Sequence, residues 1–222
     1  MKQKSSQDLW VLLRQVLGIT NSPLCESLDL RPSHGECQVW AILAYRVLTS
    51  IVGLEVLDMS TVVKKSPLPY THKYLSVHLK SNEIVLDGTR LERLLRRETK
   101  RLRIKDDMIP SLYGVRICGS VLGSAGDYAV LDGTADQFFP ARQELPHSVQ
   151  ETGFYGHPQR APKLLCDAYA EGHESTATSD YLCRYTEKVF REALVRNRNI
   201  NDYIIFGIWD PLVALPSRGH FL

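Results

Sequence analysis

Three observations predict an α+β fold in which one buried helix packs on an antiparallel sheet. Helical patterns come first along the chain, and short strand patterns follow them. The run from Cys37 to Val52 is almost wholly apolar, as is typical of a helix that is buried on all sides. Hydrophobic residues make up 44% of the 222 residues and charged residues 23%, values that are typical of globular domains and exclude a disordered chain.

The first part of the chain predicts two helices and a strand. Residues 6–18 should form a helix, because leucines and valines recur on one face between a Ser or Asp cap and Gly18. The apolar run over 37–52 should form the central helix and end at Gly53, and residues 54–63 should form a strand. The first helix is therefore amphipathic, and the second is buried.

A hairpin and a basic helix are expected next. Two strand-like runs, 72–79 and 83–87, flank a short polar turn, so we expect these two strands to pair with each other. The segment from Leu91 to Ile104 should form a helix with leucines on one side and a dense basic face on the other.

The rest of the chain predicts one catalytic core with an extension. The elements expected here are a β unit over 114–131, a loop over 141–163, a helix over 178–196 and a strand over 203–209. We assign residues 1–145 to the core and residues 146–222 to a C-terminal extension that packs on the same domain.

Charge and hydropathy exclude several classes of partner. Lys and Arg number 27 against 25 Asp and Glu, and a net charge of +2 does not favour nucleic acid. The longest uncharged apolar stretch, Val47 to Leu54, is far shorter than the ~20 residues that cross a bilayer, so no membrane association is expected. The five cysteines form no CxxC pair and no signal-peptide core is present, which predicts a cytoplasmic protein, or an effector exported without a signal peptide.

Cys37 is the strongest candidate for a reactive residue. It lies at the start of the buried helix, where unpaired backbone N–H groups and the helix dipole favour a thiolate and stabilise a developing oxyanion. Gly35 lets the preceding loop turn tightly beside the sulfur. Ser33 and Gln38 are near enough in sequence to assist an oxyanion, and the sequence does not choose between them. The alternative interpretation is a buried structural cysteine.

A thiolate nucleophile needs a base, and the base needs an orienting acceptor. His72 begins the first strand of the expected hairpin and Asp87 ends the second, so pairing would bring both to the same open end. The carboxylate would then accept from one imidazole nitrogen while the other nitrogen faces the sulfur of Cys37. This geometry predicts a Cys37, His72 and Asp87 triad.

The residues around this triad resemble a known family. The pattern consists, in order, of Gly35-x-Cys37-x-x-x-Ala41 on the buried helix, His72-x-Tyr74 on one strand and Val85-Leu-Asp87-Gly-Thr89 on the next. It resembles the transglutaminase-like core of the papain-like cysteine enzymes, over about residues 33–90. That family includes transglutaminases, arylamine acetyltransferases, proteases and bacterial toxins that deamidate host glutamines.

The resemblance implies an enzyme that transfers acyl groups from a carboxamide through a thioester. Cys37 would be the nucleophile, His72 the general base and Asp87 the orienting acid. The expected reaction is deamidation or transamidation of a glutamine in a protein or peptide, with no cofactor and no metal. A papain-like protease and a non-catalytic interaction protein that keeps the fold are the alternatives.

Other residues compete for the same roles. Asp132 begins the segment Asp-Gly-Thr-Ala-Asp-Gln-Phe, which resembles a strand end of some bacterial transglutaminase-like proteins. It is the weaker candidate for the acid because no histidine lies between Thr99 and Asp132 to pair with it in a local hairpin. His78, on the same strand as His72, is the alternative base, although a structural role is favoured.

Two further patterns are interpreted more simply. Cys25, His34, Cys37 and His72 do not have the spacing of a zinc site. The basic stretch from Arg90 to Lys105 is typical of a solvated helix face, and its functional interpretation is docking of an acidic protein substrate close to the active site.

Overall fold

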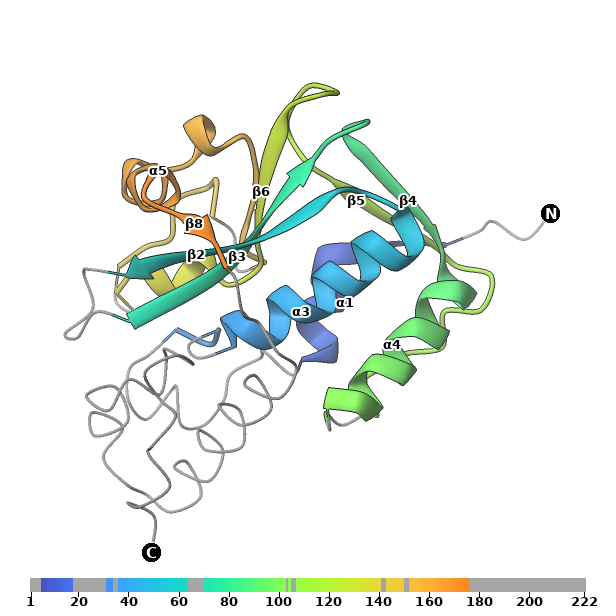
Figure 1. Cartoon of the computed structure of the whole chain (residues 1–222). Helices are drawn as coiled ribbons and strands as arrows, with labels where there is room; N and C mark the ends of the chain where they lie inside the picture. Colours follow the sequence, from blue (N-terminus) through green and yellow to red (C-terminus); the bar gives the residue numbers. More distant parts are fainter. Residues whose placement is uncertain are drawn as a thin grey trace, which may run out of the picture.

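The computed structural model describes residues 5–17, 31–33, 36–63, 70–102, 104, 107–140, 143–149 and 152–175. In this part of the chain, helices and two β-sheets form a mixed α+β fold, which confirms the predicted class (Figure 1). The helix expected over 178–196 and the strand expected over 203–209 lie outside the described residues. None of the helices within the described ranges combines the length and the apolar character needed to cross a membrane.

The first predicted helix is present, but it starts later than the pattern indicates. Helix α1 spans Leu9–Val16, and the carboxylate of Asp8 caps it by accepting from the backbone N–H of Trp10 at 2.8 Å. Ser6–Asp8 form strand β1 instead, because they pair in parallel with strand β5. Long-range pairing therefore extends the chain up to the residue that caps the helix.

The buried helix is confirmed. Helix α3 spans Cys37–Val47 and continues as the π-helical turn η1, Leu48–Val52. The turn ends at Gly53, whose φ of 71° lies in the left-handed region that glycine adopts without strain. Trp40 is fully buried, as expected for a helix that contacts neighbours on all sides.

The larger sheet has five strands in the order β7-β6-β3-β2-β8. These strands are β2 (Val56–Val63), β3 (Tyr70–His78), β6 (Tyr128–Asp132), β7 (Phe154–Gly156) and β8 (His173–Glu174), and all neighbours pair antiparallel. The smaller sheet has the order β1-β5-β4, with β4 at Glu83–Asp87 and β5 at Arg116–Ser120.

The predicted hairpin between residues 72–79 and 83–87 is wrong. Strand β3 pairs with β2 and β6, whereas β4 pairs with β5 in the other sheet. After β3 the chain turns away from its own sheet, and the backbone N–H of Leu79 donates to Asp127 O at 2.9 Å, immediately before β6. Pairing with β6 places Leu75 opposite Leu131, and both side chains are fully buried in the core. A local hairpin between β3 and β4 would not form this cross-strand pair.

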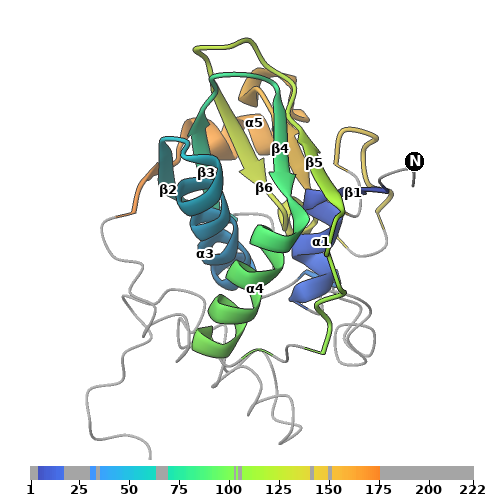
Figure 2. The ribbon, with the colours of Figure 1, turned by 90° about the vertical axis from the view of Figure 1, so that its right-hand side faces the viewer.

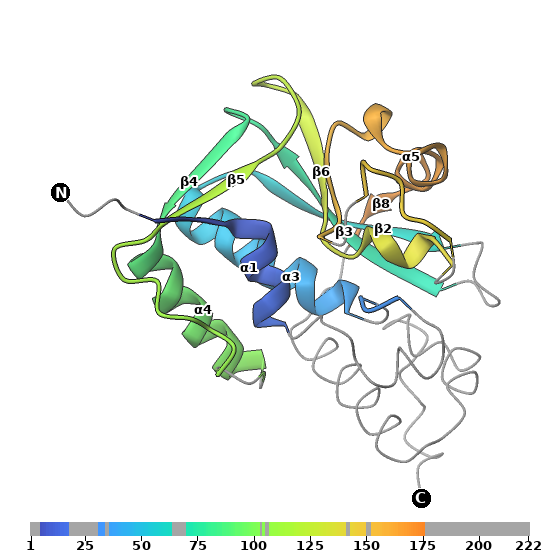
Figure 3. The ribbon, with the colours of Figure 1, turned by 180° about the vertical axis from the view of Figure 1, so that it is seen from behind.

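The five-stranded sheet carries a separate core on each face. Leu75 and Leu131 belong to the core formed with α1, α3 and the helix α4 (Gly88–Leu102), and Figures 2 and 3 show α1 and α4 beside α3. Tyr74 and Val130 alternate to the other face, where they pack with the helix α5 (Lys163–Ala170). Figures 1 and 3 place α5 across this sheet from α3.

The described part of the predicted C-terminal extension belongs to the same packed body. The segment expected as a loop over 141–163 contains β7 and the short 3-10 turn η3, Pro158–Arg160. Strand β7 pairs with β6, and α5 packs on β2 and on the 3-10 helix η2, Ala135–Phe138. These elements therefore surround the carboxyl end of β6.

Candidate active site

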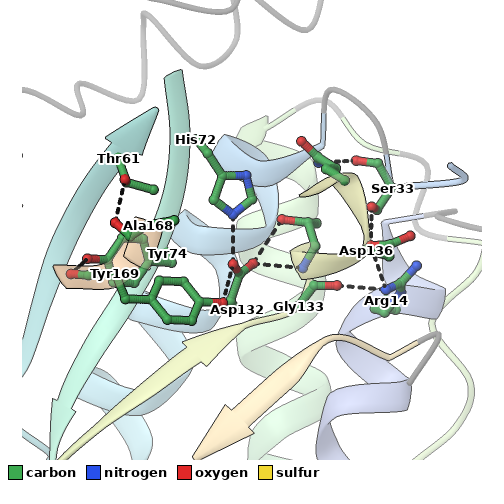
Figure 4. Close-up of polar contacts among 12 residues, drawn as sticks. Arg14, Ser33, Thr61, His72, Tyr74, Asp132, Gly133, Asp136, Ala168 and Tyr169 are labelled. Atoms are coloured by element: carbon green, nitrogen blue, oxygen red, sulfur yellow. Dashed lines mark hydrogen bonds and ion pairs between the residues drawn. The ribbon is translucent and has the colours of Figure 1, made fainter. Parts of the chain in front are cut away.

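A buried histidine and a buried aspartate meet on two neighbouring strands. His72 lies near the start of β3, and Asp132 is the last residue of β6, which runs antiparallel to it. His72 Nε2 is 2.7 Å from Asp132 Oδ2, and both side chains are fully buried (Figure 4). A charged pair at this depth requires further hydrogen bonds to offset the cost of removing it from water.

The carboxylate of Asp132 receives those hydrogen bonds from two other residues. Thr134 donates to Oδ1 from its backbone N–H at 3.0 Å and from its hydroxyl at 3.3 Å. Tyr169, on α5, donates its hydroxyl to Oδ2 at 2.9 Å. Both carboxylate oxygens are thus occupied, which holds the group in one orientation toward His72.

Cys37 supplies the thiol beside this pair. It is the first residue of α3 and is 2% exposed. His72 Nε2 is taken by Asp132, and His72 Nδ1 has no hydrogen-bond partner in the described part of the chain. Nδ1 is therefore the ring nitrogen that is left to face the sulfur, and the nearby Cys37 side chain raises the pKa of His72.

The environment of His72 favours the imidazolium. Burial alone lowers the pKa of His72, but the charge of Asp132, the hydrogen bond to it and the contact with Cys37 together raise this pKa to about 10. Phe138 packs edge-on against the imidazole with ring centroids 4.8 Å apart, which restricts rotation of the ring. The site therefore holds a protonated imidazole between the sulfur of Cys37 and the carboxylate of Asp132 at neutral pH.

A second buried network joins the segment before Cys37 to the segment after Asp132. Asp136 accepts a hydrogen bond from the hydroxyl of Ser33, and Gln137 donates to the backbone carbonyl of Ser33. Arg14, buried on α1, donates to Gly133 O at 2.7 Å and lies 3.6 Å from the carboxylate of Asp136 (Figure 4). These contacts tie the segment before Cys37 to the turn that follows Asp132.

The electrostatics of Asp136 are consistent with this structural role. Burial raises the pKa of the Asp136 carboxyl, while the Arg14 guanidinium and the hydrogen bond from Ser33 lower it. Gly133, at the centre of the network, has room for no side chain, because a Cβ there would lie 2.0 Å from the indole of Trp40. The turn after Asp132 is therefore packed tightly against the central helix.

Asp87 is not in this site, and its predicted pairing with His72 is wrong. It is exposed at the end of β4, in the other sheet, and its carboxylate accepts from the backbone N–H of Arg90 at 2.9 Å. Asp87 therefore caps helix α4. Asp132, the alternative candidate, occupies the position beside His72 because β6 and not β4 is the neighbour of β3.

The other sequence candidates lie away from the pair or make structural contacts. His78 Nε2 contacts the backbone carbonyl of Gly126 at 2.9 Å, and its ring packs on Tyr128, consistent with a structural role. Gln38 is buried at the second position of α3. Cys25, His34 and Gly35 lie outside the described residues, and no cluster of three or more possible metal ligands occurs within the described ranges.

The basic helix is not next to the triad residues. Its leucines are buried as predicted, and Arg90, in its first turn, donates to the carbonyl of Ser50 at 3.3 Å. Ser50 lies in η1, at the opposite end of the central helix from Cys37. The basic face is expected near the site because it follows Asp87, and that premise is wrong because Asp87 lies in the other sheet. Docking of an acidic partner on this face stays a prediction.

Sequence reasoning missed several residues around the pair. Phe138 and Thr134 belong to the Asp-Gly-Thr-Ala-Asp-Gln-Phe segment, so a closer reading of that motif would have found them. Arg14 is buried on α1 although it is charged, and the amphipathic pattern of this helix does not indicate its burial. Tyr169 carried no local signal, because only the packing of α5 brings it to Asp132.

Comparisons with known proteins add no homologue to this geometry. No protein-family model, no curated protein and no solved structure matches the chain. The residues themselves are thus the basis for the function. A thiol at a helix start, an imidazole and a buried carboxylate supply the parts of a cysteine nucleophile, its proton carrier and an orienting acid.

Proposed function

We propose that this chain is a cysteine-dependent acyltransferase that acts on a carboxamide, with Cys37 as nucleophile, His72 as proton carrier and Asp132 as orienting acid. The observation that carries the proposal is the fully buried His72–Asp132 pair, whose second imidazole nitrogen is left for the thiol at the start of α3. Burying a charged pair costs free energy, and apolar residues in the same place would stabilise the fold at least as well. A buried pair of this kind is therefore more typical of a functional site.

The arrangement is similar to the transglutaminase-like core. A cysteine heads a buried helix, a histidine stands near the start of a strand, and an aspartate ends the neighbouring antiparallel strand. Asp132 takes the position that the sequence pattern assigned to Asp87. The inserted elements β4, α4 and β5 separate the two strands in sequence, so the papain-like core would be interrupted rather than continuous.

In the first half of the proposed reaction, the Cys37 thiolate attacks the carbon of a glutamine carboxamide and forms a C–S bond. The carbonyl electron pair moves to the oxygen, where backbone N–H groups at the start of α3 can stabilise the charge. As the tetrahedral intermediate collapses, the C–N bond breaks and the His72 imidazolium gives its Nδ1 proton to the nitrogen. Ammonia leaves, and a thioester to Cys37 remains.

The second half restores the enzyme. Water attacks the thioester while neutral His72 accepts its proton, and the C–S bond breaks to release a glutamate side chain and the thiolate. If a lysine amine attacks in place of water, the product is an isopeptide. Asp132 keeps its hydrogen bond to His72 Nε2 and stabilises the imidazolium that forms again at the end of the cycle.

The proposal is tested with a pool of glutamine-containing peptides, prepared by digesting a denatured protein mixture, and with a fluorescent primary amine as second substrate. Mass spectrometry should show deamidated or amine-modified glutamines with the native chain and none with Cys37→Ala. New peptide termini that depend on Cys37 would indicate a protease. If no peptide changes, or if Cys37→Ala is as active as the native chain, the proposal of a cysteine enzyme fails.

A further inference from the structure

Tyr169 shares an oxygen atom of Asp132 with His72. Its hydroxyl donates to Oδ2 at 2.9 Å, and His72 Nε2 lies 2.7 Å from the same atom. The other oxygen, Oδ1, accepts from Thr134. A neutral donor and a charged donor thus compete for one carboxylate oxygen, and Figure 4 shows both side chains directed at it.

The hydroxyl of Tyr169 is fixed in place by the end of α5. Thr61 on β2 donates to Ala168 O at 2.6 Å, and Tyr74 on β3 donates to Tyr169 O at 3.3 Å. The rings of Tyr74 and Tyr169 pack with centroids 4.8 Å apart. Gly172 lets the chain pass over this pair, because a Cβ there would lie 1.8 Å from the Tyr74 hydroxyl. The contact with Asp132 is therefore built by several residues of the sheet and of α5.

We propose that Tyr169 is a positioning residue that fixes the carboxylate of Asp132 and weakens its hold on the His72 imidazolium. The inference rests on the proposed function, in which His72 must give up a proton to the leaving nitrogen. A carboxylate that bonded His72 alone would hold the imidazolium more tightly and make it a poorer acid. A second donor on the same oxygen disperses part of the negative charge and reduces this effect.

The charge of Asp132 reaches several titratable groups besides His72. It acts on Tyr74 on β3, Asp136 on η2, Tyr155 on β7 and Tyr169 itself, while Cys37 on α3 acts on His72 and Arg14 on α1 acts on Asp136. Burial raises the pKa of Tyr169 well above its ordinary value, so its hydroxyl keeps its proton at neutral pH. Tyr169 thus acts as a neutral donor and does not itself titrate.

The test compares Tyr169→Phe with Tyr155→Phe, a matched loss of a tyrosine hydroxyl that donates to Thr152 O and bonds neither Asp132 nor Tyr169. Histidine is labelled with carbon-13, the His72 signal is assigned by its loss in His72→Gln, and its titration is followed by NMR in the full chain. Tyr169→Phe should raise the pKa of His72 by about half a pH unit to one unit, the size of one hydrogen bond's net contribution. Tyr155→Phe should leave that pKa unchanged.

Two reference variants separate the possible failures. Asp132→Asn should lower the pKa of His72 strongly, and if it does not, the proposed triad itself is wrong. If Asp132→Asn acts as expected but Tyr169→Phe leaves the pKa of His72 unchanged or lowers it, only the role of Tyr169 is wrong. Should Tyr169→Phe fail to fold, Thr61→Val loosens the end of α5 instead, and it should produce a smaller upward shift. A downward shift or none in that variant would overturn the inference.

Discussion

The pentapeptide Val-Leu-Asp-Gly-Thr occurs twice, at 85–89 and at 130–134, and its two copies have different roles. Their local structures are similar. Each aspartate ends a strand and accepts a hydrogen bond from a backbone N–H shortly after it, from Arg90 at 2.9 Å in the first copy and from Thr134 at 3.0 Å in the second. The pentapeptide therefore determines a strand end with a carboxylate that holds the following turn.

The surroundings of the two copies determine their roles. Asp87 is exposed on β4, at the edge of the three-stranded sheet, and the helix that follows it is amphipathic. Asp132 is fully buried on β6, directly beside β3, and is followed by a single 3-10 turn. Identical residues thus form a helix cap in one place and a partner for His72 in the other. The reason is that β4 pairs with β5, whereas β6 pairs with β3 and β7.

The largest difference between the two copies should appear in the proposed reaction. Asp132→Asn should slow the conversion of glutamine peptides by about 10³- to 10⁴-fold, as expected when the carboxylate that orients and charges a catalytic imidazole is lost. Asp87→Asn should leave the rate within about twofold, because asparagine caps a helix as well as aspartate does. Rates are measured by mass spectrometry of the peptide pool. Equal losses in both variants would contradict the assignment of the acid.

The second largest difference between substitutions at Asp132 and at Asp87 should appear in the pH dependence of stability. The pKa of folded His72, about 10, lies above its ordinary value of 6.5, so the folded state binds this proton more tightly than the unfolded state. The stabilisation is fully present below pH 6.5 and is lost as the pH rises through 10. Urea unfolding of the native chain and of Asp87→Asn should therefore show decreasing stability over this range.

Asp132→Asn should reverse this slope. Without the carboxylate, burial is left as the main influence on His72 and lowers its folded pKa, so stability should fall when the pH drops below about 6.5. If Asp132→Asn still loses stability as the pH rises from 6.5 to 10, as the native chain does, a group other than the His72–Asp132 pair is responsible for that loss.

The glycines of the two copies give a third comparison, at the level of packing. A Cβ on Gly88 would lie 2.4 Å from Leu112 O, and one on Gly133 would lie 2.0 Å from the Trp40 indole. Each Gly→Ala change should therefore destabilise the fold by about 1–3 kcal/mol, as overpacking does, measured by urea unfolding. Only Gly133→Ala should also slow alkylation of Cys37, because only that turn holds the acid. If Gly88→Ala slows alkylation of Cys37 as much as Gly133→Ala does, the two turns do not differ in their influence on Cys37.

The smallest effect is expected for the helix cap. Asp87→Ala removes the acceptor for the backbone N–H of Arg90 and should cost about 1 kcal/mol of unfolding free energy. Asp87→Asn is the control and should cost almost nothing. A loss of several kcal/mol in Asp87→Ala would show that Asp87 has a partner beyond the first turn of α4.

Local patterns were sufficient to predict much of the architecture. The apolar run after Cys37 has no polar face, so it could be assigned to a buried helix, and Gly53 marked its end. The placement of Cys37 at a helix start followed from the same run. The position of His72 on a strand was also predictable, because the aromatic and aliphatic residues that follow it are typical of a strand.

Non-local pairing limited the prediction of the site. The turn between β3 and β4 has the composition of a hairpin, but the core on β3 is completed by β6, which lies some fifty residues later. Local spacing therefore favours Asp87 over Asp132 as the acid, although the motif that follows Asp132 also resembles the family. Tyr169 could not be predicted at all, because its contact depends on how α5 packs across β2 and β3.

Site-resolved alkylation tests the central claim, the Cys37–His72–Asp132 triad, most directly. The native chain, Asp132→Asn and Asp87→Asn are treated with iodoacetamide at pH 7, and mass spectrometry gives the rate of labelling at each of the five cysteines. The triad predicts that Cys37 reacts fastest, although it is buried, that Asp132→Asn slows this cysteine alone, and that Asp87→Asn does not. Labelling of Cys37 that is no faster than that of Cys118, or that is unchanged in Asp132→Asn, would contradict the account.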